Sequence, residues 1–214
     1  MFGGVIVILF KKYNIDFRSL FKKGVKPIKE QFSVLLLCGR MGSGKTYLSI
    51  KFAIDLLRKE KSFTTIRTNI KTLKMPKDLE NIEIIYFDNI RELYNSKCNT
   101  IDIIDELGKI FPKECRMDKD FYNYLQHSRK QSRVALLIHQ EFLQTPTWIR
   151  GAIREVFTTF PITFTHFVKS YRGVPYLNDN CEWSVDPTMI YIYKRNRSIT
   201  CLYDTFEMVT TTYS

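Results

Sequence analysis

Gly39-Arg40-Met41-Gly42-Ser43-Gly44-Lys45-Thr46 decides the fold, because this stretch matches G-x-x-x-x-G-K-[ST], the phosphate-binding P-loop motif. The apolar run from Ser33 to Cys38 precedes it and predicts a buried strand. The segment from Tyr47 to Lys59 follows it and predicts a helix, since its apolar residues recur at helical spacing. A chance glycine-rich turn would lack this strand-loop-helix context, so we predict a site for nucleotide phosphates.

The residue types of the loop suit that chemistry. Glycines let the backbone curl so that successive N–H groups point at a phosphate, and the helix N-terminus adds partial positive charge. Lys45 is placed for the β- and γ-phosphate oxygens, and the Thr46 hydroxyl for Mg²⁺. We therefore predict ATP and Mg²⁺ as cofactors. The predicted nucleotide-binding residues are Gly39, Met41, Gly42, Ser43, Gly44, Lys45, Thr46 and Tyr47.

A second motif is the apolar run that begins at Thr100 and ends in Asp105-Glu106, which fits the Walker B pattern. We predict that Asp105 holds Mg²⁺ and that Glu106 orients or deprotonates the attacking water. The alternative is an ordinary strand followed by acids at a helix N-terminus, where acids are favoured anyway. Asp102 competes for the metal role from inside the strand. We expect this strand to lie beside the P-loop strand, with Lys45 and Glu106 facing a common hollow.

Length and composition bound the class of protein. The 214 residues are enough for one sizeable core and short for two. The five cysteines are scattered and form no C-x-x-C, which favours free thiols and a reducing compartment over a disulfide framework or a zinc site. No apolar run approaches the roughly 20 residues that span a bilayer, and none resembles a signal peptide. We therefore expect a soluble intracellular protein.

Charge is the next signal, since the formal net charge of +11 suggests a polyanionic partner, either nucleic acid or an acidic membrane surface. Residues 1–32 hold seven basic residues against two acidic ones, a net charge of +5. Their aromatic residues interleave with the charges and would share one helix face. We predict a basic amphipathic arm over residues 1–32 that contacts DNA, lipid or a neighbouring subunit, and a P-loop ATPase domain over residues 33–214. A helix packed on its own core is the alternative interpretation of the arm.

The other segments complete the predicted fold class, which is α/β: a RecA-like, mostly parallel sheet with helices on both faces and C-terminal antiparallel strands. Strands are predicted from β-branched and aromatic runs, and helices from apolar residues at helical spacing. The predicted strands are Ser62–Asn69, Ile82–Phe87, Val134–Ile138, Ile162–Val168, Met189–Tyr193 and Ile199–Tyr203. The predicted helices lie around Arg91–Tyr94, over Asp118–Lys130 and after Pro146 with Thr145 as cap, and turns are predicted at Asn178–Trp183 and Lys194–Ser198.

Two further groups of polar residues are candidates for the site. Gln140 follows the strand Val134–Ile138 and would lie beside Asp105, so we predict that it senses the state of the nucleotide; a polar residue leaving a strand is the alternative. An arginine at a subunit surface can reach a neighbour's γ-phosphate and stabilise charge in the transition state, although most surface arginines are only solvated. The competing arginines are Arg129, Arg133, Arg150 and Arg154.

Several stretches in order then suggest a family. They are Thr68-Asn69-Ile70, Ile103-Ile104-Asp105-Glu106-Leu107-Gly108-Lys109-Ile110-Phe111-Pro112, His127-Ser128-Arg129-Lys130, Gln140 with Ile149-Arg150, and Leu202-Tyr203-Asp204-Thr205-Phe206-Glu207. Over about residues 34–207 the chain resembles the zonular occludens toxin (Zot) family, the assembly ATPases of filamentous phages within the FtsK–HerA group of DNA-pumping ATPases. The resemblance implies an ATP-driven translocase of viral DNA that forms a homo-oligomeric ring, in which Arg129 or Arg150 completes a neighbour's site.

The resemblance leaves the destination of the DNA open. Filamentous-phage members usually carry a transmembrane helix and an extracytoplasmic domain after the ATPase, and this sequence lacks both, so packaging into a preformed shell is expected as well as extrusion. The expected location is the host cytoplasm, with contact to a capsid or the inner membrane through residues 1–32. Two other classes stay open: a P-loop kinase of a small molecule or nucleotide, and a membrane-associated factor that uses ATP only to assemble.

Overall fold

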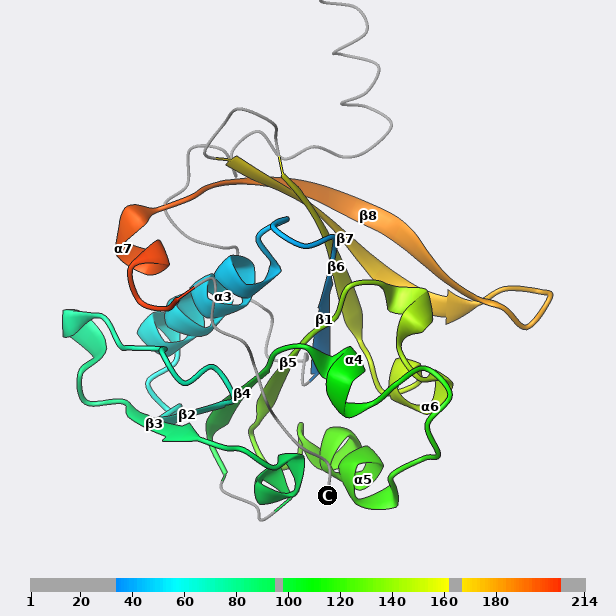
Figure 1. Ribbon diagram of the computed structural model, residues 1–214, viewed down its shortest axis with the longest axis horizontal. Coiled ribbons are helices and arrows are strands. Elements are labelled where there is room, and N and C mark those ends of the chain that lie inside the picture. Colours follow the sequence, from blue (N-terminus) through cyan, green and yellow to red (C-terminus); the bar gives the residue numbers. More distant parts are fainter. Residues whose placement is uncertain (1–33, 95–97, 162–166, 205–214) are drawn as a thin grey trace, which may run out of the picture.

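The computed structural model describes residues 34–94, 98–161 and 167–204 of the chain (Figure 1). The predicted basic arm of residues 1–32 lies outside the described residues, as does the Thr205-Phe206-Glu207 part of the terminal family stretch. Among the helices of the described residues, none has both the length and the apolar character that crossing a bilayer would require.

The described chain is organised around one sheet of eight strands in the order β3-β2-β4-β5-β1-β6-β7-β8. The first six strands of that order run parallel, and the last two are added antiparallel. The predicted fold class is therefore confirmed. The strands are β1 (Val34–Cys38), β2 (Thr65–Thr68), β3 (Glu83–Tyr86), β4 (Thr100–Ile104), β5 (Val134–Ile138), β6 (Glu155–Pro161), β7 (Phe167–Leu177) and β8 (Trp183–Lys194).

Helices cover both faces of this sheet (Figure 1). The long helix α3 (Lys45–Lys59) lies on one face with the short helix α7 (Arg197–Thr200), while α4 (Leu107–Ile110), α5 (Lys119–His127) and α6 (Thr147–Arg150) lie on the other. Three short 3₁₀ helices in the connections are η1 (Lys77–Leu79), η2 (Ile90–Leu93) and η3 (Phe142–Gln144).

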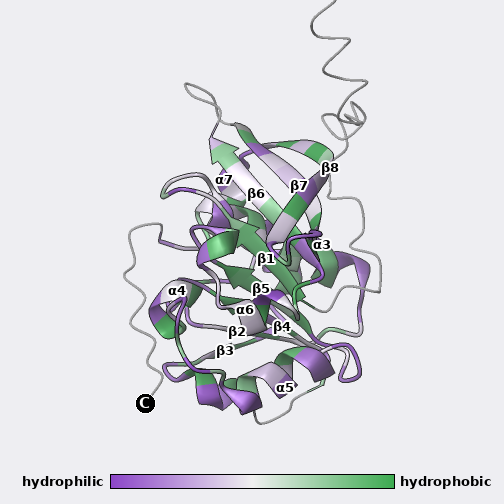
Figure 2. Ribbon diagram, turned by 90° about the vertical axis from the view of Figure 1, so that its right-hand side faces the viewer, coloured by the Kyte–Doolittle hydropathy of each residue, from purple (hydrophilic) through white to green (hydrophobic). Residues whose placement is uncertain are grey.

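The sheet separates two apolar cores because successive side chains of a strand point to opposite faces. In β1, Leu35 and Leu37 pack on the α3 face, while Val34 and Leu36 pack on the face covered by α4, α5 and α6. Figure 2 shows the apolar strands in the interior and polar colour on the outer side of α5. Burial on both faces explains why the central strands are continuous apolar runs rather than alternating ones.

Two local predictions in the C-terminal half are wrong. Ile199–Tyr203 is not a strand: the Asn196 side chain accepts a hydrogen bond from Ser198 N at 3.0 Å, caps α7 and lets the buried Ile199 pack against the α3 face. A short apolar run fits a strand or a buried helical turn equally well. Thr145 is not the cap of α6, since its hydroxyl bonds to Glu141 O at 3.4 Å and Pro146 occupies the cap position.

The prediction that the P-loop strand and the Asp-Glu strand lie side by side is also wrong. β5 lies between them, paired with β1 through Leu36↔Leu137 and with β4 through Ile103↔Leu136. All five residues of β5 are apolar and buried, which suits the centre of the sheet. A motif identifies the strand that carries a loop or an acid, but it does not give the order of the strands in the sheet.

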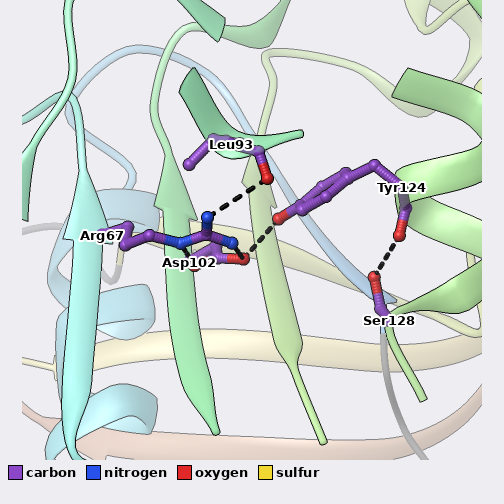
Figure 3. A network of polar contacts seen from close by, with 5 residues as sticks. All are labelled: Arg67, Leu93, Asp102, Tyr124 and Ser128. Carbon is purple, nitrogen blue, oxygen red and sulfur yellow. Dashed lines mark hydrogen bonds and ion pairs between the residues drawn. The ribbon is translucent and has the colours of Figure 1, made fainter. Parts of the chain in front are cut away.

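Asp102 belongs to a buried network that joins β2, β4 and α5 (Figure 3). Arg67 donates from Nε to Asp102 Oδ1 and from Nη2 to Asp102 Oδ2, each at 2.6 Å, and from Nη1 to Leu93 O at 3.1 Å. The Tyr124 hydroxyl donates to Asp102 Oδ2 at 2.5 Å. Both Asp102 oxygens are thus bonded inside the protein, which fits a structural role and not the competing metal role.

Candidate active site

The P-loop runs from β1 into α3 with three residues at positive φ, namely Gly39, Gly42 and Gly44. At Gly39, with φ of 148°, a Cβ would lie 2.5 Å from Thr159 O and 2.5 Å from Ser43 Oγ, so a larger residue does not fit. Gly44, with φ of 95°, forms the left-handed turn that starts α3. Lys45, Thr46 and Tyr47 then supply first-turn N–H groups, which have no acceptor within the helix.

Lys45 curls back over this loop. Its ammonium group donates to Gly39 O at 2.8 Å and to Arg40 O at 3.1 Å. Burial lowers the pKa of Lys45, and the nearby Asp105 carboxylate opposes that shift. The side chain therefore lies at the centre of the loop with an acid close by, which is where the sequence analysis expects a phosphate-binding lysine.

Thr46 and Asp105 meet at the C-terminal edge of the sheet, where the Thr46 hydroxyl donates to Asp105 Oδ2 at 3.0 Å. The other Asp105 oxygen accepts from Glu106 N at 2.8 Å. The pKa of Asp105 is raised, chiefly because the carboxyl is buried, and these two hydrogen bonds oppose the shift. The two residues predicted for the metal are thus in direct contact.

This contact forms although β5 separates the two strands. The start of the P-loop is hydrogen-bonded to the end of β5, with Gly39 N donating to Gln140 O at 2.9 Å and His139 N donating to Leu37 O at 3.0 Å. The loop and the first turn of α3 therefore extend past the end of β5 toward β4. The catalytic interpretation requires the functional groups to meet, and the loop achieves this without adjacent strands.

The chemistry of Thr46 and Asp105 fits Mg²⁺. A hydroxyl and a carboxylate are oxygen ligands, and Mg²⁺ in nucleotide sites is held by only one or two protein ligands together with phosphates and waters. The buried Asp105 carboxylate, with its raised pKa, would regain a compensating charge from a cation.

Glu106 follows Asp105 in a left-handed conformation with φ of 52°, which is unusual for a residue other than glycine. Its side chain is 40% exposed and pairs with the Lys109 ammonium group one turn later in α4. Strained backbone of this kind is found preferentially at functional sites. Glu106 and Asp105 both lie close enough to Lys45 to influence its charge, so the acids and the lysine share one side of the sheet edge.

His139, which the sequence did not single out, lies beside the predicted residue Gln140 at the end of β5. It is 7% exposed, whereas Gln140 is exposed. His139 Nδ1 accepts from Glu141 N at 3.1 Å, and Nε2 lies 2.6 Å from where a Cβ of Gly108 would be. Burial lowers the pKa of His139, and Lys45 adds to the shift. The end of β5 thus touches the helix that follows Glu106 through His139.

Further supports of the loop come from late in the chain and carry no motif. The Thr159 hydroxyl of β6 donates to Cys38 O at 2.9 Å and is hydrogen-bonded to Ser43 Oγ at 2.7 Å. Arg195, just after β8, donates to Gly42 O at 3.2 Å. Asn69 lies earlier in the chain and supports the acid instead, since it bonds to the main chain of Asp105. Unlike Thr159 and Arg195, it had a sequence signal, its place in the stretch Thr68-Asn69-Ile70.

The loop residues that are predicted to bind nucleotide differ in what their side chains do. Met41 is 88% exposed at the tip of the loop, so its side chain points to solvent and only its backbone helps to form the loop. Tyr47 is 2% exposed, and its hydroxyl donates to Lys194 O at 3.1 Å and accepts from Asn196 N at 2.9 Å. Its side chain therefore holds the C-terminal segment, which leaves its first-turn N–H for a nucleotide.

The four competing arginines do not join the P-loop within one chain. Arg129 is exposed and precedes β5, so it lies near the amino ends of the parallel strands, opposite the P-loop. Arg154 is exposed next to the start of β6. Arg133 is buried with its guanidinium 4.6 Å from the ring centroid of Tyr124. Arg150 is buried and donates to Thr145 O at 2.7 Å and to Leu143 O at 3.1 Å. Exposure leaves Arg129 and Arg154 able to reach a second subunit.

Comparison with solved structures places this geometry among known folds. The N-terminal domain of zonular occludens toxin from Neisseria meningitidis superposes with a TM-score of 0.54 at 17% identity, over 81% of this chain and 99% of that chain. The genome packaging NTPase B204 from Sulfolobus turreted icosahedral virus 2, in complex with ATP-gammaS, superposes with a TM-score of 0.51 at 14% identity, over 74% and 97%. At these identities the likeness shows a shared fold.

The sequence itself gives the family. No curated protein matches the chain in a sequence search. The protein-family model described as "Zonular occludens toxin (Zot)" matches residues 33–205, from the P-loop strand to the segment after α7. That match covers most of the chain, including the P-loop, the Asp-Glu pair and Asn69. The chain is therefore a member of the zonular occludens toxin (Zot) family.

Proposed function

We propose that the protein is an ATP-driven DNA translocase of a virus or phage, which works in genome packaging or in virion assembly and extrusion. The observation that carries the proposal is the 3.0 Å hydrogen bond between Thr46 and Asp105, formed beside Lys45 and directly before Glu106. The proposed phosphate-binding loop, metal-binding pair and general base then lie together at the carboxyl ends of the parallel strands.

In the proposed reaction, the first-turn N–H groups of α3 bind the phosphates and Lys45 neutralises the β- and γ-phosphate oxygens. Thr46 and Asp105 would hold Mg²⁺, which would stabilise the negative charge that develops on the phosphate oxygens. Glu106 accepts a proton from the attacking water. To do so, its carboxylate must either leave the Lys109 ammonium group or bind the water while it stays paired with Lys109. Asn69 keeps the main chain of Asp105 in place.

DNA as the moved polymer is supported by charge and by family. The net charge of +11 favours a polyanion, and the fold is shared with a protein described as a viral genome packaging NTPase. We also propose a homo-oligomeric ring, in which the exposed Arg129 or Arg154 would reach the γ-phosphate bound by a neighbouring subunit. Arg150 is proposed to shape the loop after β5 from within its own chain, since it bonds to two carbonyls there.

The proposal is tested by measuring ATP hydrolysis with no DNA, with single-stranded DNA and with double-stranded DNA, across a salt series. We expect Mg²⁺-dependent hydrolysis that one form of DNA stimulates, with stimulation falling steeply between roughly 50 and 200 mM salt because phosphate contacts release counterions. Lys45→Ala is the control for contaminating activity. Hydrolysis that neither form of DNA changes would contradict a translocase, and phosphate transfer to a small acceptor would favour a kinase.

The predicted arm of residues 1–32 has its own assay. We propose that its net charge of +5 recruits the protein to a polyanionic surface, either DNA, a capsid or an acidic membrane. Flotation with acidic liposomes, comparing the full chain with a chain that starts at residue 33, separates these surfaces. Flotation that depends on the arm would favour the membrane, and loss of DNA stimulation without the arm would favour DNA.

A further inference from the structure

The segment that follows β8 lies against the P-loop, although it is about 150 residues later in the chain. The Tyr47 hydroxyl in the first turn of α3 donates to Lys194 O at 3.1 Å and accepts from Asn196 N at 2.9 Å. These two bonds hold the backbone on both sides of Arg195. Val168 of β7 also packs at the loop, 2.9 Å from where a Cβ of Gly44 would be. The position of Arg195 is therefore fixed by its neighbours.

The Arg195 guanidinium lies on the loop itself. Its Nη2 donates to Gly42 O at 3.2 Å and is 3.4 Å from where a Cβ of Gly44 would be. Its Nε is buried, and among the described residues it has no hydrogen-bond partner. One cation thus bonds to the loop at Gly42 and lies on the side of the loop to which a Gly44 Cβ would point.

Two roles fit a guanidinium at this place. It could only clamp the Gly42 carbonyl and so keep the loop in shape. It could also bind the group that the loop encloses, because a guanidinium has five donors in a planar fork that matches phosphate oxygens, and one hydrogen bond to a carbonyl uses a single donor. The second role is favoured because the guanidinium lies at a loop whose motif binds phosphates, and one hydrogen bond to a carbonyl makes little use of its charge.

We propose that Arg195 binds the diphosphate portion of the nucleotide in the P-loop of its own chain. The inference rests on the proposed function, since it requires nucleotide in that loop. It adds a third phosphate-binding element to Lys45 and the first turn of α3, and it comes from the antiparallel hairpin rather than from the parallel sheet. Nucleotide occupancy is then coupled to the position of β7 and β8, because Arg195 is the residue that directly follows β8.

The experiment measures affinity for two probes, a fluorescent ADP analogue and inorganic pyrophosphate as its competitor. Pyrophosphate isolates the phosphate contacts from those to base and ribose. The decisive variants are Arg195→Gln, which keeps an N–H donor for the Gly42 carbonyl without the charge, and Arg195→Lys, which keeps the charge. Arg197→Gln is the matched control, since Arg197 is exposed on α7 two residues later. Thermal unfolding of each variant shows whether it is folded.

We expect Arg195→Gln to weaken binding of both probes by a similar factor, roughly 10- to 100-fold for a lost charged hydrogen bond. Arg195→Lys should restore part of the affinity, because it keeps the charge without the planar fork, and Arg197→Gln should change nothing. Unchanged affinity in folded Arg195→Gln would overturn the inference and leave the clamp as its role. A loss for the ADP analogue but not for pyrophosphate would also overturn it. If the unaltered protein binds neither probe, the proposed function itself fails.

Discussion

Asn69 holds the main chain of Asp105 on both sides of that residue: its Oδ1 accepts from Asp105 N and its Nδ2 donates to Asp105 O, each at 2.9 Å. Asn69 directly follows β2, and Asp105 directly follows β4, the next strand in the sheet. The Asn69 side-chain amide therefore takes the place of a further pair of backbone hydrogen bonds between β2 and β4, at the point where the two strands end. It fixes the backbone of Asp105 while leaving the carboxylate to Thr46.

The first prediction follows from this pair. Asn69→Ala removes two hydrogen bonds worth about 1 kcal/mol each, so the Asp105 carboxylate loses its fixed position. We expect a higher Mg²⁺ concentration for half-maximal ATP hydrolysis, by roughly tenfold, with a smaller change in the affinity for metal-free nucleotide. A Mg²⁺ titration of the hydrolysis rate measures this.

The control for that titration is Asn89→Ala. Asn89 caps η2 by accepting from Arg91 N at 2.9 Å, so its loss lowers stability by about 1 kcal/mol without touching the site. An equal shift of the Mg²⁺ response in both variants would mean that Asn69 acts through general stability and not through Asp105.

A second prediction separates nucleotide binding from hydrolysis. Lys45→Ala removes the ammonium group at the centre of the loop, and we expect nucleotide binding or turnover to be lost. Glu106→Gln keeps the shape of the side chain but cannot accept a proton, so we expect ATP binding with barely measurable hydrolysis. Equilibrium binding of an ATP analogue and phosphate release measure the two effects. Normal turnover in Glu106→Gln would remove Glu106 from the mechanism.

Much of the fold could be predicted, because several segments have a sequence that fits only one kind of secondary structure. Five apolar residues flanked by Arg133 and His139 predicted β5 to the residue, and the P-loop fixed β1 and α3. The structure differs where the sequence allows two answers. Ile199–Tyr203 fits a strand or a helical turn, and only the Asn196 cap and the space beside α3 decide between them.

The site could be predicted where motif residues supply it and not where tertiary pairing does. Lys45, Thr46 and Asp105 were found because the motifs give their spacing. Thr159 and Arg195 were not found, since they reach the loop only after β6 pairs with β1 and the hairpin pairs with β6. Nothing within a few residues of either position distinguishes it from an ordinary strand residue or a surface cation.

A third prediction concerns the contact between α4 and the end of β5. Gly108→Ala would place a Cβ 2.6 Å from His139 Nε2, too close for two nonbonded heavy atoms, so either the buried His139 ring or α4 with the adjoining Glu106 must shift. We expect a loss of turnover that exceeds the loss of nucleotide affinity. His139→Ala removes the clashing ring, and the double variant should recover part of the turnover. Two effects that simply add would show that the residues do not act through this contact.

A fourth prediction is a pH dependence of stability that belongs to His139. Burial lowers the pKa of His139 below its ordinary value of 6.5, with Lys45 adding to the shift and Glu141, through its N–H bond and its charge, opposing it. Below pH 6.5 the unfolded chain gains a proton on this ring that the folded chain does not. Stability should therefore fall as the pH drops below 6.5, by up to about 1.4 kcal/mol per pH unit, until the folded pKa is reached.

Denaturant unfolding at about pH 7.5 and about pH 5.5 measures this contribution. His139→Gln should lose less stability between the two conditions than the unaltered protein does. His127→Gln serves as the matched control, because His127 is exposed at the end of α5. The same loss in all three proteins would assign the pH dependence to other groups.

The last prediction concerns the buried network around Asp102, where two kinds of loss can be compared. Asp102→Ala leaves the Arg67 guanidinium, which is 3% exposed, without its carboxylate, and removing one partner of a buried ion pair costs about 3–5 kcal/mol. Tyr124→Phe removes only a hydroxyl, and Asp102 keeps both bonds to Arg67, so we expect about 1 kcal/mol. Tyr176→Phe removes a hydroxyl bonded to Asp186 in an exposed pair and should cost almost nothing. The free energy of unfolding in denaturant orders the three. If Asp102→Ala were no more costly than Tyr124→Phe, the buried ion pair would not be the main contribution of this network to the free energy of unfolding.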